Sequence, residues 1–406
     1  MFILEGPYAS DIMLDWLEAS QHPTLGNAFA REVTAKGRTL NLVDPADAAA
    51  RIDAGERVYS SSESALEWVL ANVHDEHLLR CIRLCKDKAE TRRALATVDP
   101  TFFFRECTME ELLAIDPGEL PFPLVVKPAA GFISFGVHVV RKASDWDATI
   151  NLLREEMTSR NVHPSSVVTA NRFIIEGYLS GQEYAVDLYF NGEGEPVILN
   201  VLQHDFRDAA DTSDHLYFTS PHIIRSAAPA LRRWFQHANE TFRFRNYCLH
   251  AEIRVRHAPQ QDPIEAFADP ANVHVIELNP LRFAGLCGTD VGYYAFGIRT
   301  YAYYLANQKP DWESVLAERS TSAATGMGVL ETPPNWKQGC RIDYDKIEQG
   351  VTLNGALDNL CELRPMNPDT EGAACFPLFR IPAGEQGKRV RDFMLGYNAN
   401  DYLISR

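Results

Sequence analysis

Acidic and amide side chains gather in two short segments with strand-like alternation, "HAEIRV" at 250–255 and "VHVIELNP" at 273–280. Alternation puts Glu252 on one face of the first strand, and Glu277 with Asn279 on one face of the second. If the strands are neighbours, the two carboxylates repel each other unless a cation lies between them. Two carboxylates and an amide oxygen are hard ligands that suit Mg²⁺. The segments therefore predict a divalent metal site.

A structural ion pair is the alternative interpretation of the same acids. Arg254 shares a strand face with Glu252, and Arg282 follows the second strand. Either guanidinium could neutralise the carboxylates in place of a metal ion.

A single cation lies at the entrance of a small-residue stretch in "VVKPAAGFISFGVHVV", residues 125–140. Two β-branched runs flank it, so the segment predicts a hairpin with Lys127 at its base. A flexible tip that exposes backbone N–H groups can wrap an anion, and the Lys adds a point charge. The alternative is a plain solvent-exposed hairpin.

A third segment, "FIIEGYLSGQEYAVDLYF" at 173–190, reads as strand, break and strand. The break at Gly177–Leu179 exposes backbone groups beside apolar residues, and these could receive a purine. After the break, Glu183 and Asp187 share a strand face. That face could equally be only the solvated side of the strand.

The sequence also predicts the helices and strands that position these residues. We expect a helix that starts after Asp87, with Asp87 as its N-cap, Lys88 in its first turn and Glu90 closing a capping box. The strand–Gly–helix opening at the N-terminus favours an α/β domain. Other strands and helices are expected at 1–6, 10–19, 39–44, 63–73, 144–157, 172–203, 247–256 and 272–282.

Bulk composition narrows the partners and the compartment. The 406 residues suggest two or three domains, and the net charge of −16 argues against nucleic acid or an anionic membrane as partner. We expect no signal peptide in the first residues, and no apolar run approaches the roughly 20 residues of a membrane span. The eight Cys include no CxxC pair, so we expect buried thiols in a reducing cytoplasm.

Taken in order, these segments resemble the ATP-grasp superfamily of carboxylate–amine ligases over about 84–300. "DK" at 87–88 is similar to the start of that family's first phosphate-binding helix, and "PLVVKPAAGFISFGVHVV" to its phosphate-binding hairpin. "IIEGYLSGQEYAVD" resembles its hinge, and "HAEIRV" with "VIELNP" its metal-binding strands. Arg282 lies one place later than in the family's usual pattern.

The resemblance implies roles for individual residues. Mg²⁺ (or Mn²⁺) would be bound by Glu252, Glu277 and Asn279. The substrate carboxylate would contact Arg254 and Arg282, which are therefore the catalytic candidates. ATP would be bound by Lys88, Lys127, Ser134, Gly136, Glu176, Gly177, Tyr178, Leu179 and Glu183.

The resemblance also implies the architecture: an α/β (α+β ATP-grasp) chain whose two lobes clasp ATP. We expect an N-terminal Rossmann-like α/β domain at 1–83, a lobe with the phosphate-binding hairpin at 84–180 and a lobe with the metal-binding strands at 181–310. Residues 311–406 would form an appended C-terminal subdomain.

The implied activity is an ATP-dependent, Mg²⁺-dependent ligase that forms an amide or peptide bond through an acylphosphate. The partners would be small-molecule carboxylate and amine substrates, such as an amino acid, and a homodimer is left open. The alternatives are an ATP-grasp carboxylase or kinase with another acceptor, and a non-catalytic ATP-binding module. His204, His215 and His222 are candidates for the base that deprotonates the amine, or ordinary loop histidines.

Overall fold

The structure is a computed structural model. It describes residues 1–130, 136–159, 171–208, 211, 215–286, 288–317, 319, 323–332, 336, 340–354, 360–366 and 373–405. Over this part of the chain the strands form four sheets. Ser134 and the rest of the tip at 131–135 lie outside the described residues.

The N-terminal region is a parallel sheet in the order β3-β2-β1-β4. Each strand is followed by a helix, which is the connection that parallel strands require. This confirms the predicted α/β opening. The elements are β1 (Phe2–Ile3), α1 (Asp11–Ser20), β2 (Thr24–Leu25), α2 (Ala28–Ala35), β3 (Leu42–Val43), α3 (Pro45–Asp53), β4 (Tyr59–Ser60) and α4 (Ala65–Asn72).

Two helices that meet at Asp87 lead out of this region, α5 (Glu76–Lys86) and α6 (Lys88–Leu95). The Asp87 carboxylate accepts hydrogen bonds from the N–H groups of Ala89 and Glu90, so it is the predicted N-cap. The predicted capping box was wrong, because the Glu90 side chain accepts from Arg93 instead. The cap fixes Lys88 at the N-terminus of α6.

The next region is an antiparallel sheet in the order β5-β8-β6-β7. One face packs on α7 and α8 through a core that includes Val126, Trp146 and Ile175. Strand alternation therefore turns Lys127 and Glu176 to the other face. The elements are β5 (Phe104–Cys107), α7 (Met109–Ala114), β6 (Leu124–Pro128), β7 (His138–Val140), α8 (Trp146–Ser159) and β8 (Phe173–Gly177).

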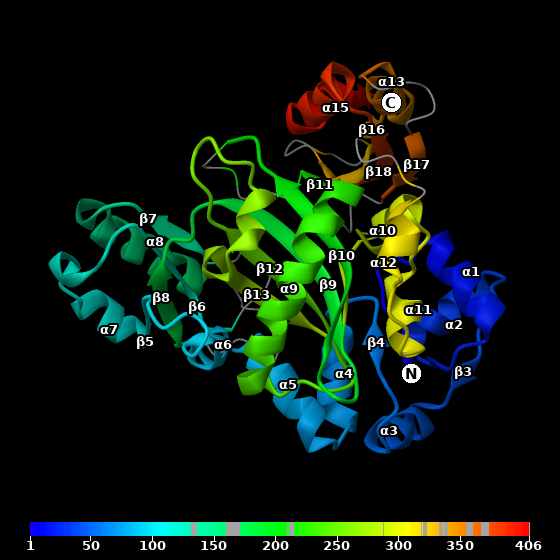
Figure 1. Ribbon diagram of the computed structural model, residues 1–406, viewed down its shortest axis with the longest axis horizontal. Coiled ribbons are helices and arrows are strands. Elements are labelled where there is room, and N and C mark those ends of the chain that lie inside the picture. The colour runs from blue at the N-terminus through cyan, green and yellow to red at the C-terminus, as the bar shows by residue number, and fades with distance from the viewer. Residues whose placement is uncertain are drawn as a thin grey trace.

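The largest sheet runs through the middle of the molecule in the order β13-β12-β9-β10-β11-β14-β18-β15, with β17 also paired to β18. One face carries Tyr184, Val186 and Leu188, which share a core with the long helix α9 (Figure 1). Its N-terminal half consists of β9 (Gln182–Phe190), β10 (Pro196–Asp205), β11 (Leu216–Thr219), α9 (Pro221–Phe242), β12 (Tyr247–Val255) and β13 (Val273–Pro280).

The C-terminal region was expected to be an appended subdomain, and its strands in fact continue this central sheet. Strand β14 pairs with β11, and β18 pairs with β14. Figure 1 shows these elements at the upper right, beside α10 and the N-terminal helices. The elements are α10 (Gly288–Phe296), α11 (Thr300–Leu305), α12 (Trp312–Ala317), β14 (Ala324–Gly328), β15 (Leu330–Glu331), β16 (Cys340–Ile342), α13 (Tyr344–Asn354), β17 (Leu360–Pro365), β18 (Ala373–Ile381), α15 (Glu385–Leu395) and β19 (Leu403–Ser405).

None of the helices in the described ranges has the length and apolar character needed to cross a membrane.

Candidate active site

The two predicted metal ligands on neighbouring strands face each other directly. Glu252 on β12 is the cross-strand partner of Glu277 on β13. Asn279 donates from Nδ2 to Oε1 of Glu252 at 3.2 Å. A register shift follows Glu252, and such bulges re-aim side chains. The three side chains are therefore neighbours in the structure, as the sequence predicted.

Lys88 reaches this acidic group from the N-terminus of α6. Its Nζ lies 2.9 Å from Oε1 of Glu277, and its backbone N–H donates to the carbonyl of Ala129. Burial alone would raise the pKa of Glu277, but Lys88 outweighs burial and holds that pKa below its usual range. Burial alone would lower the pKa of Lys88, and the attraction of Glu277 raises it overall. Both groups therefore keep their charges.

A second buried charge cluster lies on the facing lobe. Nζ of Lys127 is 2.5 Å from one carboxylate oxygen of Glu176, and Nε of Arg92 donates to the other at 2.7 Å. All three side chains are about 95% buried. Burial alone would raise the pKa of Glu176, but the two cations bring it down to about 2. Burial lowers the pKa of Lys127.

Arg92 was not singled out from the sequence. It lies one helical turn after Lys88, so the spacing places both cations on the same face of α6. Its Nη1 donates to the carbonyl of Val275 in β13. Arg92 therefore joins Glu176 of one lobe to the strand that carries Glu277 in the other.

Glu183, the residue expected to bond the ribose, has both carboxylate oxygens engaged by neighbours. Oε1 is 2.9 Å from Nδ1 of His204, and Oε2 accepts from Nε of Arg254 at 2.9 Å. Burial would raise the pKa of Glu183, but His204 and Arg254 lower it overall. The His204 ring stacks on Tyr217 at 4.1 Å between centroids and also contacts Phe206.

Arg254 was considered as a structural partner of the metal ligands, and the structure pairs it with Glu183 instead. Arg282 lies 3.8 Å from Glu63 and donates to the carbonyl of Phe283. Its Nε is buried without a hydrogen-bond partner among the described residues. Glu63 also contacts Lys86. Neither of the two predicted substrate arginines therefore neutralises the Glu252–Glu277 pair.

The hinge between the lobes begins where β8 ends. The N–H of Gly177 donates to Phe103, and the N–H of Tyr178 donates to Pro123. The N–H groups of Gly177 and Tyr178 are thus engaged within the protein. Gly181 follows with φ +120°, and a Cβ there would lie 2.2 Å from the carbonyl oxygen of Val255. Only glycine allows this close approach of hinge and β12.

At the hairpin, Gly136 has φ +68°, in the left-handed region that favours glycine. A Cβ there would lie 3.2 Å from atoms of Pro128 and Leu153. This glycine lets the chain turn back into β7 beside the base of the hairpin. Ser134, the other predicted phosphate contact of the tip, lies outside the described residues.

A buried His–Asp pair lies next to the acids on the same sheet face. Nδ1 of His250 is 2.7 Å from Oδ1 of Asp187, which also accepts from the N–H of Ala284. Sequence alternation had placed Asp187 on a face with Glu183 without assigning it a role. Two of the histidines considered as the base that deprotonates the amine differ in their surroundings. His204 contacts the Glu183 carboxylate, whereas His222 is exposed at the start of α9.

The acidic group offers few ligands to a divalent ion. Within the described part of the chain, no three His, Cys, Asp or Glu side chains are grouped so that they could hold a metal ion. A metal here would depend on two carboxylates, the amide oxygen of Asn279 and oxygens from nucleotide and water. Like charges directly opposite each other across strands are unfavourable without a cation, and Lys88 supplies one to Glu277. The oxygen atoms of Glu252, Glu277 and Asn279 are nevertheless of the type that a divalent ion such as Mg²⁺ binds.

Residues 120–290 match the family model described as an ATP-grasp domain. A search of the curated proteins finds no match. Among solved structures, the chain is similar to L-amino acid ligase from Bacillus licheniformis, with a TM-score of 0.62 and 15% identity, covering 100% of this chain and 98% of the other.

Two further solved structures have the same fold. Phosphoribosylglycinamide synthetase from Anaerococcus prevotii has a TM-score of 0.56 and 12% identity, with 100% of this chain and 98% of the other covered. Biotin carboxylase from Campylobacter jejuni has a TM-score of 0.59 and 10% identity, with 100% and 91% covered. At these identities the likenesses show the fold, and the predicted fold class is confirmed.

Proposed function

Because residues 120–290 match the ATP-grasp domain model and the chain shares the fold of ATP-grasp structures, we propose that it is an ATP-dependent carboxylate–amine ligase of the ATP-grasp superfamily. It activates a small carboxylic acid, such as an amino acid, as an acylphosphate and joins it to an amine. The observation that carries the proposal is the facing of Glu252 and Glu277 across β12 and β13, with Lys88 on the same acidic group.

The nucleotide lies between the lobes in this proposal. Lys88 and Lys127 are buried cations of the lobe 84–180, paired with Glu277 and Glu176, and burial strengthens their attraction for phosphate oxygens. Glu176 holds Lys127 in place, and Arg92 holds Glu176. The carbonyls of the hinge and the peptide of Leu179 bond the adenine edge, and Glu183 accepts from the ribose hydroxyls.

Mg²⁺, or Mn²⁺, is the metal that Glu252, Glu277 and Asn279 suit, since all three offer oxygen ligands. When bound, such an ion neutralises charge on the β- and γ-phosphates. The protein then contributes orientation and electrostatics.

The reaction asks the protein for positioning more than for covalent chemistry. A substrate carboxylate attacks the γ-phosphate, ADP leaves, and an amine then displaces phosphate from the acylphosphate. Water must be kept from this chemistry, because it would hydrolyse the intermediate. Arg282, whose Nε has no hydrogen-bond partner among the described residues, is the better candidate for the substrate carboxylate. Arg254 orients Glu183.

The remaining assignments are also proposals. The boundaries 1–83, 84–180, 181–310 and 311–406 describe folding regions, although the last shares a sheet with the third. The cytoplasm is the proposed compartment, supported by seven described cysteines that are all free thiols, most of them buried.

The test is ADP release from Mg²⁺-ATP in the presence of pooled amino acids and small carboxylates with amines, followed by mass spectrometry of the product. We expect carboxylate-stimulated ADP release and an amide product. Glu277→Ala should lower the rate by about a hundredfold or more, the scale of losing one preorganised electrostatic group. Glu240→Ala, an exposed change on α9, should leave the rate unchanged.

The outcomes separate the alternatives. Bicarbonate-dependent turnover would identify a carboxylase, and a phosphorylated product without an amide would identify a kinase. ATP binding without turnover from any pool would support a non-catalytic module. Absence of ATP binding would refute the nucleotide site itself.

A further inference from the structure

A cavity of about 650 Å³ lies far from the acids, between α9, the start of β10 and the segment 309–317. It opens on the α9 side of the central sheet, because Ile198 belongs to the same core as α9. Glu183 and Asp187 alternate with that core and face the other side. None of the residues that line the cavity belongs to the proposed nucleotide site, so the two sites are separate, and the size of the cavity falls in the range of small-molecule pockets.

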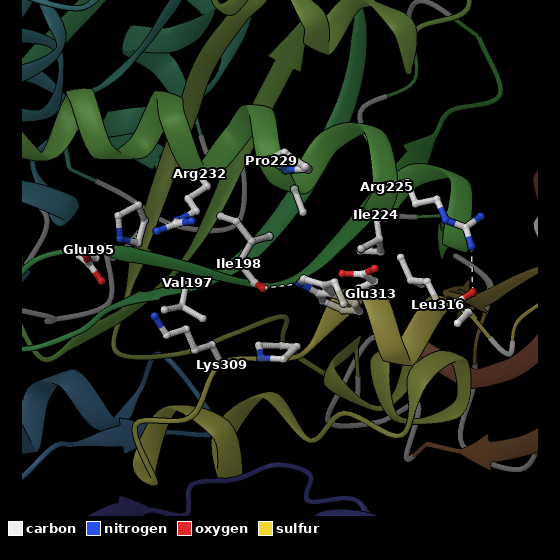
Figure 2. Close-up of a pocket in the computed structure, with 15 residues that line it drawn as sticks. Glu195, Val197, Ile198, Ile224, Arg225, Pro229, Arg232, Lys309, Glu313 and Leu316 are labelled. Atoms are coloured by element: carbon white, nitrogen blue, oxygen red, sulfur yellow. Dashed lines mark hydrogen bonds between the residues drawn. The ribbon is translucent and has the colours of Figure 1, made fainter.

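The floor of the cavity is apolar and buried. Ile198 of β10 lies opposite Ile224 and Ala228 of α9, with Leu316 closing one end (Figure 2). Val197 belongs to the core on the other face of the sheet and lines the cavity where β10 begins. Trp312, Pro196, Pro229 and Pro310 complete the apolar lining.

Two hydrogen bonds hold the walls in place. Nε1 of Trp312 donates to the carbonyl of Ile198 at 3.1 Å, which ties α12 to β10. Arg225 donates to the carbonyl of Leu316 at 2.8 Å, which ties α9 to the end of α12. The cavity is thus preformed, and a preformed site costs less ordering free energy when a ligand binds.

The rim carries an excess of positive charge. Three cations, Arg225, Arg232 and Lys309, stand against two acids, Glu195 and Glu313. The difference is one positive charge in a chain whose net charge is −16. Figure 2 shows Arg232 and Lys309 toward one end and Arg225 at the other. Arg225 spends one N–H donor on Leu316. At the other end Arg232 and Lys309 lie with the single acid Glu195, so that end of the apolar trough carries one excess positive charge.

We propose that this cavity binds a small amphipathic monocarboxylate, with its apolar chain on the floor and its carboxylate on Arg232 and Lys309. The apolar floor selects against a strongly hydrated ligand such as a sugar. The cationic end selects against an alkyl amine. The inference does not depend on the proposed ligase activity.

The experiment is calorimetric titration of the full chain with decanoate, kept below its micelle concentration. We expect one saturable site, with 1-decanol binding about tenfold or more weakly, because a charge-assisted hydrogen bond is lost. Decyltrimethylammonium and acetate should give no saturable heat. Equal affinity for decanoate and 1-decanol, or no saturation at all, would refute the proposal.

Matched variants locate the site. Arg232→Gln should weaken decanoate binding about tenfold, whereas Arg233→Gln, on the next residue of α9 and outside the cavity lining, should not. Ala317→Trp should abolish binding, because the exposed Ala317 lines the cavity and a larger ring would fill it. Equal losses in the two arginine variants, or binding that survives Ala317→Trp, would place decanoate elsewhere and overturn the assignment.

Discussion

Glu176 links more of the candidate site than any other single side chain. Its two oxygens neutralise Lys127 and Arg92, and all three groups are almost completely buried. Removing one member of such a cluster leaves charges without compensation, which costs far more than the net contribution of the intact pair.

We therefore predict that Glu176→Gln lowers the free energy of unfolding by about 3–5 kcal/mol, measured by urea unfolding at neutral pH. Glu90→Gln is the matched control, because Glu90 forms an exposed pair with Arg93. It should cost about 0.5 kcal/mol or less. Equal effects of the two substitutions would contradict the description of the Glu176 cluster.

The same carboxylate predicts an acid dependence of stability. The pKa of Glu176 is about 2 in the folded chain, against an ordinary value of 4.5. A depressed folded-state pKa means that the stabilisation is complete above about pH 4.5 and is lost as the pH falls toward about 2. Urea unfolding over this range should show wild type losing its advantage over Glu176→Gln. An advantage that stays constant down to the acid limit would contradict the pKa.

At the scale of elements, the start of α6 decides where the first phosphate cation lies. Asp87 caps the helix, and its other oxygen contacts Nη1 of Arg172 at 2.6 Å. Lys88 follows directly, and the cap thereby sets its approach to Glu277.

We predict that Asp87→Ala costs about 1–2 kcal/mol of stability and raises KM for ATP, because the frayed helix start no longer positions Lys88. Asp87→Asn keeps a capping oxygen and loses the charge of the Arg172 pair, so it should retain most of the stability and a near-normal KM. Chemical unfolding and steady-state kinetics measure the two effects. A normal KM in Asp87→Ala would show that the cap does not position Lys88.

The comparison of sequence with structure is clearest among these elements. The grouping of Glu252, Glu277 and Asn279 on one sheet face could be predicted, because strand alternation is a local rule. The one long-range assumption was that β12 and β13 are neighbours. Glu183 could be placed on a face, but its partner His204 could not, because the pairing of β9 with β10 sets that contact.

Other features depend on contacts that no local pattern encodes. Arg92 joins Glu176 to Val275 across three elements, and its spacing from Lys88 was the only available signal. The cavity beside Trp312 could not be predicted from the sequence, because its apolar lining residues have the pattern of ordinary core residues. Glu90 satisfied the pattern of a capping box, yet Arg93 one turn away competed for it successfully.

At the scale of the molecule, the central sheet unites regions that the sequence suggested were separate. Leu216 on β11 pairs with Gly328, and Thr219 with Thr325, so β14 covers an edge that would otherwise be open. Open edges of buried strands promote aggregation.

A chain of residues 1–311 should therefore be aggregated when expressed, as measured by sedimentation and light scattering. The control is the full chain cleaved at an engineered protease site in the exposed stretch 306–309. Its two pieces should stay associated and folded, since the β11–β14 ladder joins them. A monodisperse, folded 1–311 fragment would show that the C-terminal strands are dispensable.

The strand order of that sheet also bears on how the chain is made. A ribosome delivers β11 long before β14, and β18 must enter between β14 and β15 after both have been synthesised. The candidate active-site strands β9, β10 and β12 are then already synthesised, while the β11 edge of their sheet remains unpaired until β14 is made. Nascent chains with such unpaired edges are prone to misassembly. This protein should accordingly depend on chaperones until about residue 381 has left the exit tunnel, and slowing translation in the 220–320 interval should lower the yield of folded enzyme.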